Sequence, residues 1–192
     1  MRDSEQPRYK QAKRRKPLGS AQMRELAMNY VARFATSSGK LEAYLLRKLR
    51  ERGWEEDAPA PDIPALVAEF AALGYVDDEA YARSRSDSLL ARGYGARRVG
   101  EALRQAGIAE PLREAASPGE AAARRAALRM VEKRRFGPFA SEPADPTRRE
   151  KQLAAMLRAG HSLSHARQLL DMTSEDAARD WVAETDDDDV ED

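Results

Sequence analysis

The stretch GYVDDEAYARSRSDSLLARGYGARRVGEALRQAGI, residues 74 to 108, predicts two helices joined by a tight turn. Asp77 is the expected N-cap of the first helix, because a carboxylate there accepts hydrogen bonds from the free amides of the first turn. This helix is expected to run to about Ala91 and to stop at the sequence GYG. The second helix is expected to end at Gly107. Its apolar residues recur at i, i+3, i+4 and i+7, as one buried helix face requires: Val99, Ala102, Leu103 and Ala106.

The same helix pair is strongly basic. Between residues 82 and 104 six arginines face two acids, Asp87 and Glu101. The arginines are Arg83, Arg85, Arg92, Arg97, Arg98 and Arg104. Because a guanidinium binds phosphate and carboxylate groups with paired hydrogen bonds, this set is the candidate contact surface for nucleic acid or for an acidic protein. The two glycines of the GYG turn would allow a close approach of the backbone. A solvated basic helix face is the alternative reading.

Helical periodicity continues on both sides of this pair, whereas strand patterns are nearly absent. In three places a predicted second helix ends at a glycine, namely Gly53, Gly107 and Gly160, so the intervals are 107 − 53 = 54 and 160 − 107 = 53 residues. Four residues before each glycine stands an apolar residue, which predicts equivalent buried positions at Leu49, Leu103 and Met156. Each copy is too small to bury a good core alone, so consecutive copies should touch one another or lie along a partner.

We therefore predict an all-α fold of three tandem three-helix, helix-turn-helix-like repeats in an elongated array. The repeats are expected at residues 20–75, 76–116 and 117–184. Residues 1–19 are expected to form a disordered basic arm, and residues 185–192 a disordered acidic tail. The arm could touch nucleic acid or be a solvated end. The tail could compete with phosphates for the basic surface or act only as a solubilising end.

Several classes of chemistry lack their residues. The chain has no cysteine, which excludes disulfides and thiolate zinc sites. No apolar run approaches the roughly 20 residues of a membrane span, and no secretory signal is visible, so a cytoplasmic protein is expected. The only histidines, His161 and His165, have no third ligand nearby and are expected to be a solvent-exposed pair at a helix start, not a metal site. Without a phosphate loop or a nucleophile motif, neither catalysis nor a cofactor is expected.

The central segment resembles the signature of the RecX family of recombination regulators. That signature is a Leu-Gly-aromatic-aliphatic-Asp-Asp-Glu run, an aromatic-Ala-Arg step, an Arg-Gly-x-Gly-x-x-Arg turn and a Leu-Arg-x-x-Gly-Ile ending. Here these elements are residues 73–79, 81–83, 92–98 and 103–108. The flanking sequences LRKLRERGW and TRREKQLAAMLRAGHS resemble the first and third repeats, so the likeness covers about residues 20 to 172. His161 replaces an aromatic residue of the family, and the acidic tail is not part of its pattern.

The resemblance implies binding to the RecA recombinase and to its filament on single-stranded DNA, with modulation, mainly inhibition, of recombinase and co-protease activity. The protein is expected to be a monomer and to bind bare single-stranded DNA weakly and in a salt-dependent way, because its net charge is zero. The alternative is a free-standing helix-turn-helix DNA-binding protein, although no helix offers the mixture of side chains that reads base edges. A third reading is a protein-interaction scaffold whose arginines serve solubility.

Overall fold

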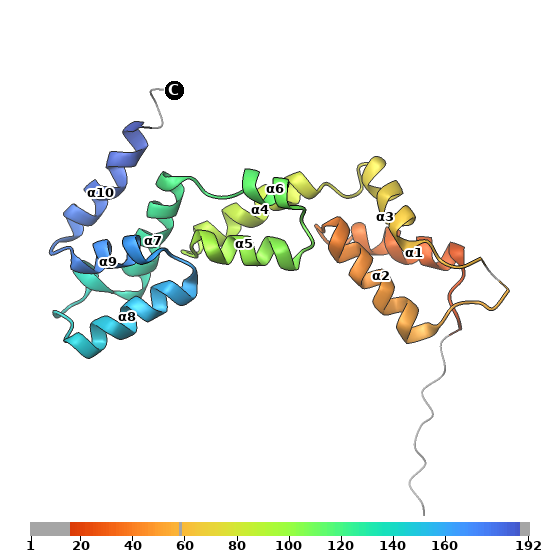
Figure 1. Ribbon diagram of the computed structural model, residues 1–192, viewed down its shortest axis with the longest axis horizontal. Coiled ribbons are helices and arrows are strands. Elements are labelled where there is room, and N and C mark those ends of the chain that lie inside the picture. The colour runs from red at the N-terminus through yellow and green to blue at the C-terminus, as the bar shows by residue number, and fades with distance from the viewer. Residues whose placement is uncertain (1–15, 58, 189–192) are drawn as a thin grey trace, which may run out of the picture.

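The computed structural model describes residues 16–57 and 59–188, and side chains only as far as residue 185. Over these ranges the chain forms ten α-helices and one short 3-10 helix, and the only strand-like pairing is an isolated bridge between Leu18 and Trp54. The helices follow one another along an extended row (Figure 1). The predicted all-α fold of tandem three-helix repeats is confirmed.

The first repeat consists of α1 (Ser20–Val31), α2 (Ser38–Arg52) and α3 (Ile63–Ala72). Ser37 caps α2 by accepting a hydrogen bond from the amide of Lys40, and Asp62 caps α3 in the same way. Their apolar faces meet in a core in which Leu41, Leu45 and Phe70 are completely buried. Leu49, expected to be a core residue, is only partly buried at the edge of this core, because the buried face of α2 passes through Leu45.

The second repeat consists of α4 (Asp78–Ala91), α5 (Ala96–Gln105) and the short α6 (Glu110–Ala115). The predicted N-cap is present, since the Asp77 carboxylate accepts a hydrogen bond of 2.8 Å from the amide of Ala80. Leu103 is completely buried, and Val99 and Ile108 are 1% exposed, so the predicted apolar face of α5 forms the centre of this core.

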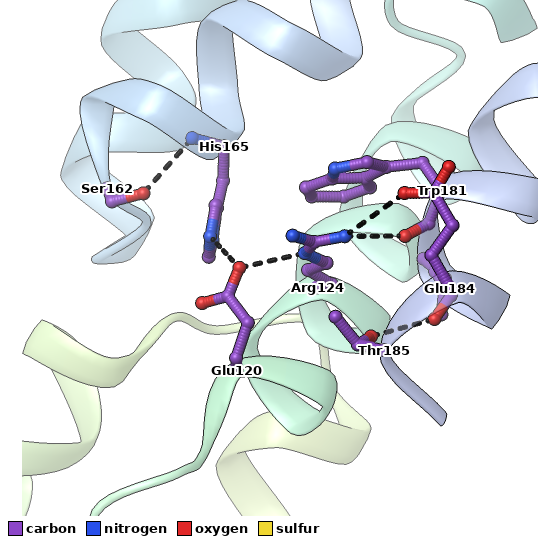
Figure 2. Close-up of polar contacts among 8 residues, drawn as sticks. Glu120, Arg124, Ser162, His165, Trp181, Glu184 and Thr185 are labelled. Atoms are coloured by element: carbon purple, nitrogen blue, oxygen red, sulfur yellow. Dashed lines mark hydrogen bonds and ion pairs between the residues drawn. The ribbon is translucent and has the colours of Figure 1, made fainter. Parts of the chain in front are cut away.

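The third repeat is larger. It consists of α7 (Glu120–Arg134), the 3-10 helix η1 (Gly137–Phe139), α8 (Pro146–Ala159) and α9 (Leu163–Asp171), and α10 (Glu175–Asp188) covers it. Its core contains Met156 and Leu169, both completely buried, and Trp181 of α10. A polar cluster fastens α10: the Arg124 guanidinium lies 4.6 Å from the Trp181 ring and donates a hydrogen bond of 2.8 Å to the Trp181 carbonyl. Figure 2 shows Glu120 bridging Arg124 and His165 beside this contact.

Both ends of the folded part differ from the expected boundaries. Leu18, placed in the disordered arm, is completely buried, and its backbone pairs with that of Gly53 and Glu55 at 3.0 Å. Residues 185–188, placed in the acidic tail, continue α10, and Thr185 is buried. Burial of a single leucine and of one helix face therefore extends the ordered part at each end. The rest of the expected arm and tail, residues 1–15 and 189–192, lies outside the described residues.

The second helices of the three repeats, α2, α5 and α8, follow one another along the lower side of the molecule in Figure 1. The N-terminus of α2 faces the C-terminus of α5, and the N-terminus of α5 faces the C-terminus of α8. At the first junction the Ser37 hydroxyl, at the start of α2, donates a hydrogen bond of 2.5 Å to the carbonyl of Ala106, at the end of α5. At the second, the amide of Gly95 donates to the Ala159 carbonyl at 3.0 Å, and that of Arg97 to the Gly160 carbonyl at 3.2 Å. Free helix-terminal donors and acceptors thus satisfy one another across the junctions, with the helix dipoles aligned.

Candidate nucleic-acid and protein contact surface

The structure divides the six arginines among three places instead of gathering them on one face. Arg83 and Arg85 stand two residues apart on α4 and therefore point in very different directions. Arg83 donates a hydrogen bond of 2.5 Å to Glu79 one turn earlier on the same helix. Arg85 is partly buried and lines a groove of about 520 Å³ between the first and second repeats, together with Lys40 and Tyr81. Only Arg85 of this pair thus borders a groove between repeats.

The arginines of α5 share one acidic partner. Arg97 and Arg98 both approach Glu101, at 3.8 and 3.4 Å, so the two guanidinium charges are partly balanced. Arg97 also donates a hydrogen bond of 2.5 Å to the carbonyl of Leu157 in the last turn of α8. Arg97 therefore has a structural role at the second junction that the sequence did not indicate. Arg104, seven residues after Arg97 and on the same helix face, is exposed and has no ion-pair partner among the described residues.

Arg92 follows the end of α4 and lies toward the third repeat. Its guanidinium is 5.6 Å from the centre of the Tyr94 ring, and its Nε donates to the carbonyl of Ser88 at 3.2 Å. It lines a cavity of about 90 Å³ with Tyr94, Lys133 and Arg134, which we name the Arg92 pocket. Lys133 and Arg134 end α7 and were not among the predicted contact residues, although the basic run in EKRRFG was visible in the sequence.

The GYG glycines serve the packing of repeats, contrary to their expected role in leaving the backbone open to a ligand. A Cβ atom on Gly95 would lie 2.4 Å from the carbonyl carbon and oxygen of Gly160. A Cβ atom on Gly93 would lie 3.2 Å from the amide of Met130 in α7. The backbone of the third repeat therefore already occupies the space beside both glycines. The first junction is similarly close, because a Cβ atom on Gly39 would lie 2.7 Å from the Cα atom of Gly107.

The prediction of two solvent-exposed histidines is wrong. His161 is only 5% exposed, and its Nε2 lies 3.0 Å from the carbonyl of Gly93, so the ring joins the second and third repeats. Burial lowers the pKa of His161, because it penalises the charged imidazolium. His165 points into the cluster of Figure 2 and lies 3.0 Å from Glu120. The two rings therefore serve separate contacts. The described residues hold no group of three potential ligands that could bind a metal ion.

Together the fold and this surface define a helical-repeat protein that presents arginines and lysines along a row of small domains. No helix in the described residues is long and apolar enough to cross a membrane. Comparison with known proteins shows to which family of helical-repeat proteins the chain belongs. Residues 77–116 match the family model described as "RecX, second three-helix domain". The regulatory protein RecX of Myxococcus xanthus (strain DK1622) is 30% identical over 167 residues, which cover 83% of this chain and 89% of the relative.

The chain belongs to the RecX family, whose members are regulatory proteins and not enzymes. Solved structures agree on the fold. The crystal structure of RecX from Lactobacillus salivarius has a TM-score of 0.60 at 20% identity, over 79% of this chain and 96% of that one. A second crystal structure, of a regulatory protein RecX, has a TM-score of 0.59 at 21% identity, over 79% of this chain and 71% of that one.

Proposed function

We propose that this protein binds the RecA recombinase and its filament on single-stranded DNA, and that it mainly inhibits recombinase and co-protease activity, thereby regulating DNA repair and recombination. Family membership over 83% of the chain is the observation that carries the proposal. The extended row of repeats supports it, because a long surface can contact several neighbouring subunits of a helical filament.

The distribution of the cations supports contacts to both DNA and protein. Arg85 borders the groove between the first two repeats, Arg104 lies exposed on α5, and Arg92 lies at the second junction. Such a series along one elongated protein can meet phosphates or carboxylates at successive positions of a filament. We propose that Arg85, Arg92, Arg98 and Arg104 make these contacts, while Arg83 and Arg97 are held largely by partners within the chain.

The alternative of a free-standing helix-turn-helix DNA reader finds less support. In such proteins the recognition helix carries the side chains that reach base edges. The third helices of the first two repeats do not: α3 has no basic residue, and the arginine of α6, Arg113, donates to the carbonyl of Ile108 at 2.9 Å. We therefore place the contacts on the second helices and at the junctions.

Titration of the protein into RecA-catalysed strand exchange on single-stranded DNA tests the proposal. Inhibition at concentrations comparable to that of RecA is expected, and the double variant Arg98→Glu/Arg104→Glu should inhibit less, because attraction becomes repulsion at both positions. The matched control is Arg148→Glu/Arg167→Glu, which makes the same charge change at exposed residues of the third repeat. Strand exchange that proceeds unchanged at a large excess of wild-type protein would refute the proposal.

A further inference from the structure

The Arg92 pocket lies where the end of α4 meets the last turn of α7 and the end of α8. Its charged lining residues are Arg92, Lys133 and Arg134, all of them cations, and no aspartate or glutamate lines it. Two of these cations come from the third repeat and one from the second. The pocket therefore depends on the junction between the two repeats and is not a property of a single helix.

Two features hold the pocket in shape. The Arg92 guanidinium rests on the Tyr94 ring, and its Nε is engaged by the Ser88 carbonyl, which leaves the terminal nitrogens available. Gly93, with a φ of 82°, turns the chain toward α7. The Nε2 atom of His161 lies 3.0 Å from the carbonyl oxygen of Gly93 and holds this turn against the third repeat. The cation from the second repeat is thus positioned against the third repeat before any ligand arrives, which lowers the entropic cost of binding.

The charges of the pocket are unbalanced. Over the described residues, neither Lys133 nor Arg134 has a hydrogen-bond or ion-pair partner for its side chain. The dipole of α7 stabilises cations in the last turn of that helix, which accounts for Lys133 and Arg134. It does not account for Arg92, which lies outside α7. Three like charges around one small cavity repel one another, so an anion that fits between them gains from all three.

We propose that the Arg92 pocket binds a phosphodiester group of single-stranded DNA. The donors of the pocket favour a phosphate group. Two guanidinium groups and one ammonium offer many hydrogen-bond donors, and the tetrahedral oxygens of a phosphate can accept from several of them at once. A cavity of about 90 Å³ has room for one such group between the three cations. Tyr94 lines the pocket and carries the Arg92 guanidinium against its ring, which orients this cation toward the anion. This proposal rests on the proposed function for the choice of DNA as the source of the phosphate.

Binding of a labelled oligothymidylate without RecA tests the pocket, with anisotropy measured at several salt concentrations. The pocket variant is Arg92→Gln/Lys133→Gln/Arg134→Gln. The control variant, Arg148→Gln/Lys151→Gln/Arg167→Gln, removes the same number and kind of charges from exposed residues of the third repeat. We expect the pocket variant to bind about tenfold more weakly at low salt, with a log–log salt slope shallower by roughly 0.7 for each phosphate that the protein no longer neutralises. The control should keep most of the affinity and the slope of the wild type.

Equal losses in the two triple variants would overturn the proposal, because they would reflect total charge alone. Lys133→Gln by itself changes an exposed side chain without a partner, so it tests the pocket even where the triple variant folds poorly; wild-type binding by this variant would also contradict it. A second arm measures thermal stabilisation by inorganic phosphate. Stabilisation by phosphate, combined with unchanged oligonucleotide binding by the pocket variant, would assign the pocket to a free phosphate and overturn the assignment to DNA.

The outcome separates this proposal from the proposed function. Oligonucleotide binding is measured without RecA, so it reports on the pocket even where strand exchange is not inhibited. A pocket variant that binds the oligonucleotide like the wild type, yet no longer inhibits strand exchange, would place a protein carboxylate in the pocket. In that case the phosphodiester assignment fails while the regulatory function stands.

Discussion

Gly95→Ala is expected to push the second and third repeats apart. A Cβ atom at this position would lie 2.4 Å from the carbonyl group of Gly160, whereas ordinary van der Waals contact begins at 3.4 Å. Because the atoms it meets belong to the backbone, no side-chain rotation can relieve the clash. The two segments must separate by about 3.4 − 2.4 = 1.0 Å, which weakens both backbone hydrogen bonds across the junction.

The size of the effect follows from those contacts. Each junction hydrogen bond contributes roughly 0.5–1.5 kcal/mol, so weakening the bonds from Gly95 and Arg97 should lower the free energy of unfolding by roughly 1–3 kcal/mol. Overpacking of a close contact gives a decrease of similar size, about 1–3 kcal/mol. Gly95 has a φ of −87°, which alanine adopts without strain, so the clash is the principal perturbation.

Denaturant titration followed by circular dichroism measures this decrease, and Gly100→Ala is the matched control. Gly100 lies inside α5, the helix that Gly95 precedes, and an added Cβ there would meet nothing within 4 Å. Its replacement should stabilise the protein by about 0.5–1 kcal/mol, because alanine favours the helix. A Gly95→Ala variant as stable as Gly100→Ala would show that the junction yields without cost, and the role assigned to these glycines would be wrong.

Three further results are expected. Leu103→Ala should lower the free energy of unfolding by roughly 2–5 kcal/mol, and the partly buried Leu49→Ala by less, in denaturant titrations; equal decreases would contradict the burial difference. Because burial lowers the pKa of His161, the folded state takes up its proton less readily than the unfolded state, so the stability this ring contributes is complete above pH of about 6.5 and declines as the pH falls through that value. Stability measured from neutral to mildly acidic pH should therefore fall less steeply in His161→Gln, and parallel curves would refute this. Arg124→Met should raise hydrogen exchange in α10 and leave that of the first repeat unchanged, since it removes the contacts to Trp181 and Glu120 (Figure 2); unaltered exchange in α10 would show that the apolar core alone holds this helix.

Local features of the sequence were sufficient to predict the helices and their repetition. Asp77 as a cap and the spacing of Val99 and Leu103 act within one or two turns of a helix, so the sequence shows them directly. The repeat-ending glycines Gly107 and Gly160 both have positive φ, as the predicted helix ends require. The resemblance to the RecX family could be seen for the same reason. The family signature consists of a helix cap, two helix ends and the Arg-Gly-x-Gly-x-x-Arg turn between them, all of which are local in the sequence.

The contacts between repeats could not be predicted in this way. From the sequence, His161 is predicted to be exposed at the start of a helix. It is buried only because the third repeat packs against Gly93 of the second. The same docking fills the space beside Gly95, turns Arg97 toward α8 and brings Lys133 to Arg92. Helix periodicity specifies which side of a helix is apolar, but not the rotation at which one repeat meets the next. That rotation depends on packing between segments far apart in the chain, and it decides which cations share a pocket.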